Sequence, residues 1–175
     1  MKTCNFRQRD LISADYLAEQ KALHAGGNYG VSGGRFAPLV DSLVGTGVVR
    51  DVLDYGCGLG YLRRNCISPI KEYDPAVRNK NDLPAPADLV VCADVLEHIE
   101  PEKIAAVLAH IESITRRFLL AAIALRPSQK NLSDGRNAHI MMLTPTKWRA
   151  ALKRAGFRGV FWHDHKHEMI GLLRK

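Results

Sequence analysis

The chain has 175 residues, 46% of them hydrophobic, which is enough for one substantial core and argues against two separate domains. Its longest strongly apolar stretch, 118–125, is far shorter than the roughly 20 residues that cross a bilayer, and no signal segment opens the chain, so we expect a cytoplasmic protein without a membrane span. The formal net charge of +7 is compatible with a nucleic acid or an anionic small molecule as partner.

The first third of the chain predicts two helices around a glycine-rich connection. Ser13 can cap the first helix, which Gly26 ends. Residues 28–35 then form the glycine-rich connection. The second helix follows as a run of apolar residues at helical spacing from Phe36 until Gly45.

From residue 48 onward, predicted strands alternate with predicted helices. Apolar and β-branched runs predict strands at 48–55, 70–73, 88–93, 118–125, 159–162 and 169–173. Apolar residues at helical spacing predict helices at 101–115 and 144–155. This alternation is typical of an α/β protein with a mostly parallel sheet and helices on both of its faces.

The strongest motif lies where the first of these strands ends. Residues 54–60 are Asp-Tyr-Gly-Cys-Gly-Leu-Gly, and glycines at alternate positions let a ligand approach bare backbone amides at the start of a helix. The dinucleotide-binding fingerprint G-x-G-x-x-G would need a glycine where this chain has Tyr61. Nicotinamide cofactors are therefore disfavoured.

An acidic residue follows the second strand at the distance expected for a nucleoside cofactor. Asp74 lies 20 residues after Asp54, and a carboxylate at that place can accept hydrogen bonds from two ribose hydroxyls. A strand, a glycine loop, a helix and a downstream acid in this order predict a nucleoside-cofactor site. The alternative is a structural glycine turn with an exposed Asp74.

Three segments together resemble the class I S-adenosylmethionine-dependent methyltransferases. Residues 52–60 are similar to the first motif of that family, 73–75 to the second, and 88–99 to the fourth-strand segment of its broad small-molecule-like branch. The resemblance covers about residues 48–125. It implies a Rossmann-like, mostly parallel sheet of the seven-stranded type in a compact single domain.

The resemblance also implies a function for each part of the chain. A single domain, 1–175, would consist of N-terminal helices and a glycine-rich loop at 1–47, a cofactor-binding core at 48–125, and a substrate loop with a C-terminal helix and hairpin at 126–175. The implied cofactor is S-adenosyl-L-methionine and the product S-adenosyl-L-homocysteine. One departure is that residues 75–86 are compressed, so the usual second helix must be short or missing.

The implied cofactor contacts fall at four places in the chain. Asp54 and the glycines would surround the methionine part of the cofactor, and Asp74 would bind its ribose. Residues 82–83 would lie beside the adenine, and residues 93–95 under the sulfonium. The predicted cofactor-binding residues are Asp54, Tyr55, Gly56, Cys57, Gly58, Gly60, Tyr61, Asp74, Pro75, Asp82, Leu83, Ala93, Asp94 and Val95.

Several polar residues outside these motifs are candidates for catalysis or substrate binding. A histidine near the sulfonium, His98, could take a proton from the methyl acceptor, although it could instead only shape the loop. The polar loop after the fourth strand and the N-terminal glycine-rich loop supply the candidate substrate contacts Tyr29, Arg35, Arg136, Asn137 and His139. The alternating histidines of 163–168 lack cysteine partners, so we expect no metal site.

The sequence narrows the class of methyl acceptor without identifying it. Residues 93–96 lack the Asp/Asn-Pro-Pro-Tyr motif of enzymes that methylate exocyclic amino groups of DNA bases, and also the Pro-Cys pair of cytosine C5 enzymes. We therefore predict transfer to an O or N atom of a small molecule or a modified nucleotide or sugar. The alternatives are a non-catalytic methyltransferase-like binding module in a larger assembly and a nucleic-acid methyltransferase, which the net charge would favour.

Overall fold

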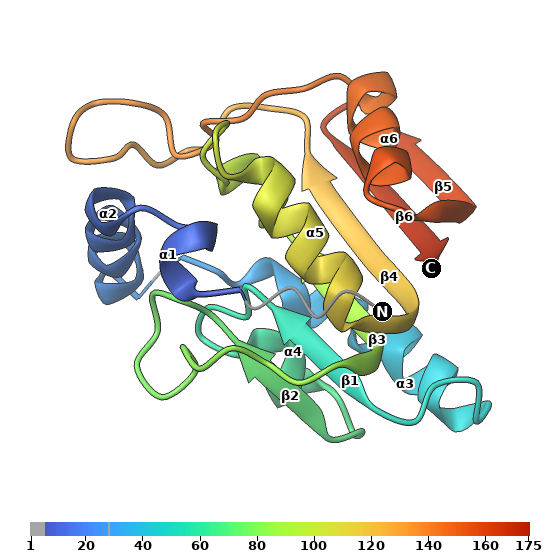
Figure 1. Cartoon of the computed structure of the whole chain (residues 1–175). Coiled ribbons are helices and arrows are strands. Elements are labelled where there is room, and N and C mark those ends of the chain that lie inside the picture. Colours follow the sequence, from blue (N-terminus) through green and yellow to red (C-terminus); the bar gives the residue numbers. More distant parts are fainter. Residues whose placement is uncertain (1–5, 28) are drawn as a thin grey trace.

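The computed structural model describes residues 6–27 and 29–175, so Asn28, the first residue of the predicted glycine-rich connection, lies outside it. Six strands form one sheet (Figure 1): β1 Val52–Tyr55, β2 Ile70–Tyr73, β3 Ala87–Ala93, β4 Thr115–Ala124, β5 Arg158–His165 and β6 Glu168–Arg174. The helices are α1 Gln8–Leu11, α2 Ala14–Ala25, η1 Ser32–Phe36, α3 Ala37–Gly45, α4 Tyr61–Asn65, η2 Leu96–His98, α5 Ile104–Ile114 and α6 Pro145–Arg154.

The strands run in the order β2-β1-β3-β4-β6-β5. The first four are parallel, with Val52 opposite both Ile70 and Leu89, and the last two form an antiparallel hairpin beside β4. The predicted Rossmann-like, mostly parallel sheet is therefore confirmed. Because the parallel strands share one direction, their carboxyl ends meet at one edge of the sheet, where the site described below is located.

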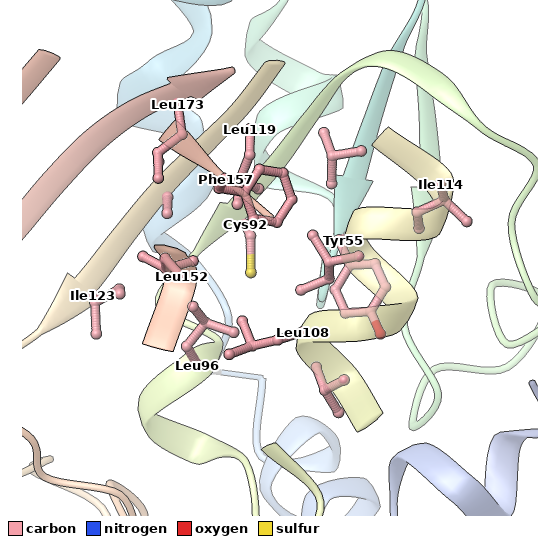
Figure 2. Packing of buried hydrophobic residues seen from close by; sticks show 14 of the residues in the cluster. Tyr55, Cys92, Leu96, Leu108, Ile114, Leu119, Ile123, Leu152, Phe157 and Leu173 are labelled. Carbon is pink, nitrogen blue, oxygen red and sulfur yellow. The ribbon is translucent and has the colours of Figure 1, made fainter. Parts of the chain in front are cut away.

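Helices cover both faces of the sheet, as predicted. On one face Leu53 and Val90 pack with residues of α1, α5 and α6, and Figure 2 shows part of this cluster around Cys92. On the other face their neighbours Val52 and Leu89 pack with residues of α3 and α4. Successive strand residues point to opposite faces, so the continuous apolar runs of the sequence fill both layers.

Side chains at the ends of two helices explain why those helices begin where they do. The Ser13 hydroxyl accepts a hydrogen bond from the Tyr16 amide at 3.2 Å, which caps α2 as predicted. Thr144 caps α6 in the same way, and Pro145 occupies its first turn. A further short helix, α1, was not predicted.

The sheet has six strands, whereas the sequence implied the seven-stranded type. The segment 74–86, which leads from β2 to β3, contains Pro75, Pro84 and Pro86 and forms neither helix nor strand. Proline has no amide hydrogen to donate to a strand ladder, so this short segment cannot add a strand beyond β2. It also lacks a second helix, in agreement with the compression noted in the sequence. None of the helices within residues 6–27 and 29–175 is long and apolar enough to cross a membrane.

Candidate active site

A cavity of about 320 Å³ lies at the carboxyl ends of the parallel strands. Its wall includes the ends of β1, β2 and β3, the residues that follow these strands, and one face of α2. The chain leaves β1 toward β2 on one side, and β3 lies on the other side of β1. Ligands of open α/β sheets bind at such a switch point in the strand order.

The glycine loop after β1 is packed so closely that side chains would not fit. Gly56 has a φ of 75°, and a Cβ added there would lie 2.5 Å from Cγ2 of Val95. At Gly58, with a φ of 50°, an added Cβ would lie 3.1 Å from the backbone of Gly30. Both positions therefore need glycine for torsion and for space, and the loop presents bare backbone.

Asp74 is buried at the end of β2 and held by the backbone. Its Oδ2 accepts a hydrogen bond from the Gly58 amide at 2.9 Å and its Oδ1 one from the Ala76 amide at 2.8 Å. A carboxylate oxygen can accept further hydrogen bonds, so Asp74 is fixed at the cavity wall and still able to bind hydroxyl groups. The predicted alternative of an exposed Asp74 is wrong, because only 5% of the residue is exposed.

His24 of α2 lies over Asp74. Its Nε2 is 3.7 Å from Oδ2 of Asp74, and its ring edge approaches Gly30 and Gly58. Burial lowers the pKa of His24, and the nearby carboxylate of Asp74 opposes that shift only partly. His24 is therefore neutral at physiological pH and adds a polar ring, without a charge, to this end of the cavity.

The segment after β3 adds a strained residue and a buried acid. Asp94, which lines the cavity, has a φ of 54°, and its amide donates to the carbonyl of Ala122 at 2.9 Å. Glu97 is fully buried, and its Oε1 accepts a hydrogen bond from the Ala124 amide at 2.6 Å. Burial raises the pKa of Glu97 to about 8, so this side chain is mostly protonated at neutral pH.

His98 is held in one tautomer. Its Nδ1 lies 2.8 Å from the carbonyl oxygen of Ala138, which can only accept a hydrogen bond, so Nδ1 carries the hydrogen. The Tyr29 hydroxyl, 2.9 Å from the same Nδ1, then donates to Oε1 of Gln20 at 3.1 Å. The Nε2 of His98 is left with a free lone pair on a ring that lines the cavity.

A second histidine repeats this arrangement. His139 Nδ1 lies 2.6 Å from the carbonyl of Arg126, and its ring centre is 4.6 Å from that of His98. Burial, followed by the neighbouring His139, lowers the pKa of His98 to about 3. The imidazole of His98 is therefore neutral and accepts, but does not donate, at Nε2.

Ten of the sequence-predicted site residues line the cavity and ten do not. Those in the lining are Tyr29, Tyr55, Gly56, Asp74, Pro75, Ala93, Asp94, Val95, His98 and His139. Those outside it are Arg35, Asp54, Cys57, Gly58, Gly60, Tyr61, Asp82, Leu83, Arg136 and Asn137.

Four of the residues outside the lining have other contacts. Asp54 is buried within β1, where loss of solvation raises its pKa to about 7. Arg35 is paired with Glu168, and Arg136 with Asp134 at 2.6 Å. Asn137 donates to the carbonyl of Ser128 at 2.9 Å and closes the 128–137 loop.

The sequence analysis missed three residues of α2 that line the cavity, Tyr16, Gln20 and His24. They are four residues apart and so share a helix face, but that face is polar and carries no hydrophobic pattern. Within residues 6–27 and 29–175, no three His, Cys, Asp or Glu side chains are arranged to hold a metal ion.

Comparison with protein families relates most of this chain to a known domain. A family model described as "Methyltransferase domain" matches residues 32–160. A search of the curated proteins finds no matching sequence.

Several solved structures share the fold. One is 1,6-didemethyltoxoflavin-N1-methyltransferase from Burkholderia thailandensis, solved with bound 1,6-didemethyltoxoflavin and S-adenosylhomocysteine. Its sequence is 18% identical to this chain and its TM-score is 0.64, and the match covers 94% of this chain and 90% of the toxoflavin enzyme. The DhpI complex with S-adenosylhomocysteine is 18% identical with a TM-score of 0.63, over 93% of this chain and 98% of its own. Magnesium protoporphyrin IX methyltransferase from Synechocystis PCC 6803 is 17% identical with a TM-score of 0.56, over 100% of this chain and 90% of its own.

Proposed function

The chain belongs to the methyltransferase domain family, and we propose that it binds S-adenosylmethionine in this cavity and transfers the methyl group to an oxygen or nitrogen atom of a small molecule. The observation that carries the proposal is that Gly56, Asp74 and His98 line one cavity. The similar solved structures support it, because those of the toxoflavin and magnesium protoporphyrin enzymes contain S-adenosylhomocysteine.

The cavity fits the cofactor in two respects. Gly56 brings backbone to the cavity wall without a side chain of its own, so a ligand can lie against the backbone. The Asp74 carboxylate is fixed by two backbone amides and can accept hydrogen bonds from ribose hydroxyls. Asp94 and Val95, directly after β3, line the same cavity and would lie beside the sulfur.

When bound, the cofactor supplies a methyl group activated by a positively charged sulfur. The protein's task is then to hold the acceptor in line with that group and to remove a proton. We assign the second task to Nε2 of His98, which accepts a hydrogen bond from the O–H or N–H of the acceptor. When the attacking atom is a hydroxyl oxygen or an amide-type ring nitrogen, methylation makes it positively charged and its proton strongly acidic, so even a weakly basic imidazole takes that proton.

The test is S-adenosylhomocysteine formation from S-adenosylmethionine in the presence of phenols, hydroxypyridines and ring N–H heterocycles. We expect turnover with at least one of these classes. His98→Gln keeps a polar side chain of similar size but no basic nitrogen, so kcat should fall by about 10²–10⁴-fold while affinity for S-adenosylhomocysteine is unchanged. A protein that binds the cofactor but turns over none of these compounds would contradict the proposal and favour the non-catalytic binding module.

A further inference from the structure

One helix face in the cavity wall is polar where a packing helix would be apolar. The buried residues of α2 are Tyr16 and Gln20, and His24 continues the same face one turn later. By contrast, α5 buries Leu108 and Ile111 against the sheet. Side chains four residues apart lie one above another, so these three residues form a continuous stripe, which we call the polar face of α2.

Each residue of the polar face has a buried atom without a hydrogen-bond partner. Within the part of the chain that the structure describes, Oη of Tyr16, Nε2 of Gln20 and Nδ1 of His24 have no partner at hydrogen-bond geometry. Burial raises the pKa of Tyr16, and the nearby Gln20 side chain offsets that rise only in part, so the two side chains lie close together and can bind one acceptor atom. The other unpaired buried side-chain atoms are spread over β2, η2 and α6. In native proteins nearly all buried polar atoms have a hydrogen-bond partner. Three unpaired atoms on one stripe that lines the cavity therefore indicate that a polar ligand forms the missing hydrogen bonds.

The two ends of the polar face lie at different parts of the cavity. His24 is 3.7 Å from Asp74, the proposed ribose ligand. Gln20, in the middle of the polar face, is bonded through Tyr29 to His98, the proposed base. Tyr16, at the other end, belongs to the same hydrophobic cluster as Ala138, whose carbonyl holds His98. The helix therefore borders both the cofactor and the acceptor.

We propose that the polar face of α2 determines substrate specificity: Gln20 Nε2 and the Tyr16 hydroxyl bind a carbonyl oxygen or ring nitrogen of the acceptor, and His24 contacts the cofactor ribose. The acceptor is then a small aromatic molecule with that uncharged hydrogen-bond acceptor next to the O–H or N–H that faces His98. This inference rests on the proposed function and adds the class of substrate to it.

The surroundings of Gln20 support an aromatic ligand whose group beside Gln20 is uncharged. Burial raises the pKa of the Tyr29 hydroxyl and lowers that of His98, so neither group is charged at neutral pH. A charged ligand group placed between them would be desolvated without a partner. The Tyr29 and His98 rings are 5.4 Å apart and those of His98 and His139 are 4.6 Å apart, so the wall offers ring edges and faces to a planar ligand.

The test uses two ring compounds of similar size, 3-hydroxy-2-pyridone and phenol, titrated into protein saturated with S-adenosylhomocysteine. Only the pyridone carries a carbonyl next to its hydroxyl. The wild type should bind the pyridone about tenfold more tightly than phenol, which corresponds to one net hydrogen bond. In Gln20→Met, which keeps the length but loses the amide, that preference should fall, because only the Tyr16 hydroxyl remains to bind the carbonyl, while phenol affinity stays the same.

Three further variants separate the explanations. Tyr29→Phe breaks the bond to Gln20 but keeps the free amide, so it should retain the preference; a loss there would mean that Gln20 acts only by positioning His98. Lys21→Ala, on the exposed face of α2, should bind both compounds and S-adenosylhomocysteine like the wild type. His24→Leu should lower S-adenosylhomocysteine affinity while keeping the preference for the pyridone.

The outcomes for the two claims are distinct. If the wild type fails to bind S-adenosylhomocysteine, the proposed function is wrong. If it binds S-adenosylhomocysteine but binds neither ring compound, or prefers the pyridone equally in Gln20→Met, the polar face of α2 does not select the acceptor and this inference is overturned.

Discussion

A methyl group added at Gly56 tests the geometry of the glycine loop. In Gly56→Ala the backbone φ of 75° would have to be adopted by alanine, which costs about 1–2 kcal/mol. The new Cβ would also lie 2.5 Å from Cγ2 of Val95, and overpacking of this kind costs about 1–3 kcal/mol. We expect the free energy of unfolding to fall by about 2–5 kcal/mol in total.

A double-mutant cycle separates the two costs. Val95→Ala removes the methyl groups that the new Cβ would meet, so in that background Gly56→Ala should cost only the torsional part, about 1–2 kcal/mol. Chemical denaturation of the wild type, the two single variants and the double variant gives all four free energies. An equal cost of Gly56→Ala in both backgrounds would refute the predicted contact between the loop and Val95.

Two further predictions concern a buried acid and a helix cap. Because the pKa of Glu97 is raised from its usual 4.5 to about 8, the folded protein keeps a proton that the unfolded chain has released, so stability should fall between pH 7 and 8 by up to about 1.4 kcal/mol. Glu97→Gln should reduce that slope in denaturation measured at the two pH values, leaving the smaller contribution of Asp54, whose pKa is raised to about 7, and an unchanged slope would contradict the assignment. Ser13→Ala removes the cap of α2 and should cost about 1 kcal/mol in thermal unfolding, against no change for Lys21→Ala on the exposed face of the same helix.

Most of the sheet follows from the sequence, and its exceptions have physical reasons. The strand predicted at 48–55 begins only at Val52, because the pairing of β1 with β2 and β3 starts there. The strand predicted at 159–162 extends to His165, although the added residues are polar. These residues pair with β6 on one side only, at the edge of the sheet, where polar side chains remain in water.

Only those parts of the candidate site could be predicted whose residues lie at a recognisable spacing within one stretch of the sequence. The glycine loop and Asp74 follow from their order after the strands. The partners of His98 come from positions 20, 29 and 138, and no pattern within the sequence links these to residue 98. The polar face of α2 was missed for the same reason, because its packing over the glycine loop is a tertiary contact.

In the proposed function, this cavity binds S-adenosylmethionine through Asp74. Calorimetric titration of the wild type with S-adenosylmethionine and S-adenosylhomocysteine tests it most directly, beside Asp74→Ala and a matched control, Asp164→Ala, which removes an exposed carboxylate of β5. We expect micromolar binding by the wild type and the control and its loss in Asp74→Ala. Absence of binding by the folded wild type, or equal binding by Asp74→Ala, would contradict the account.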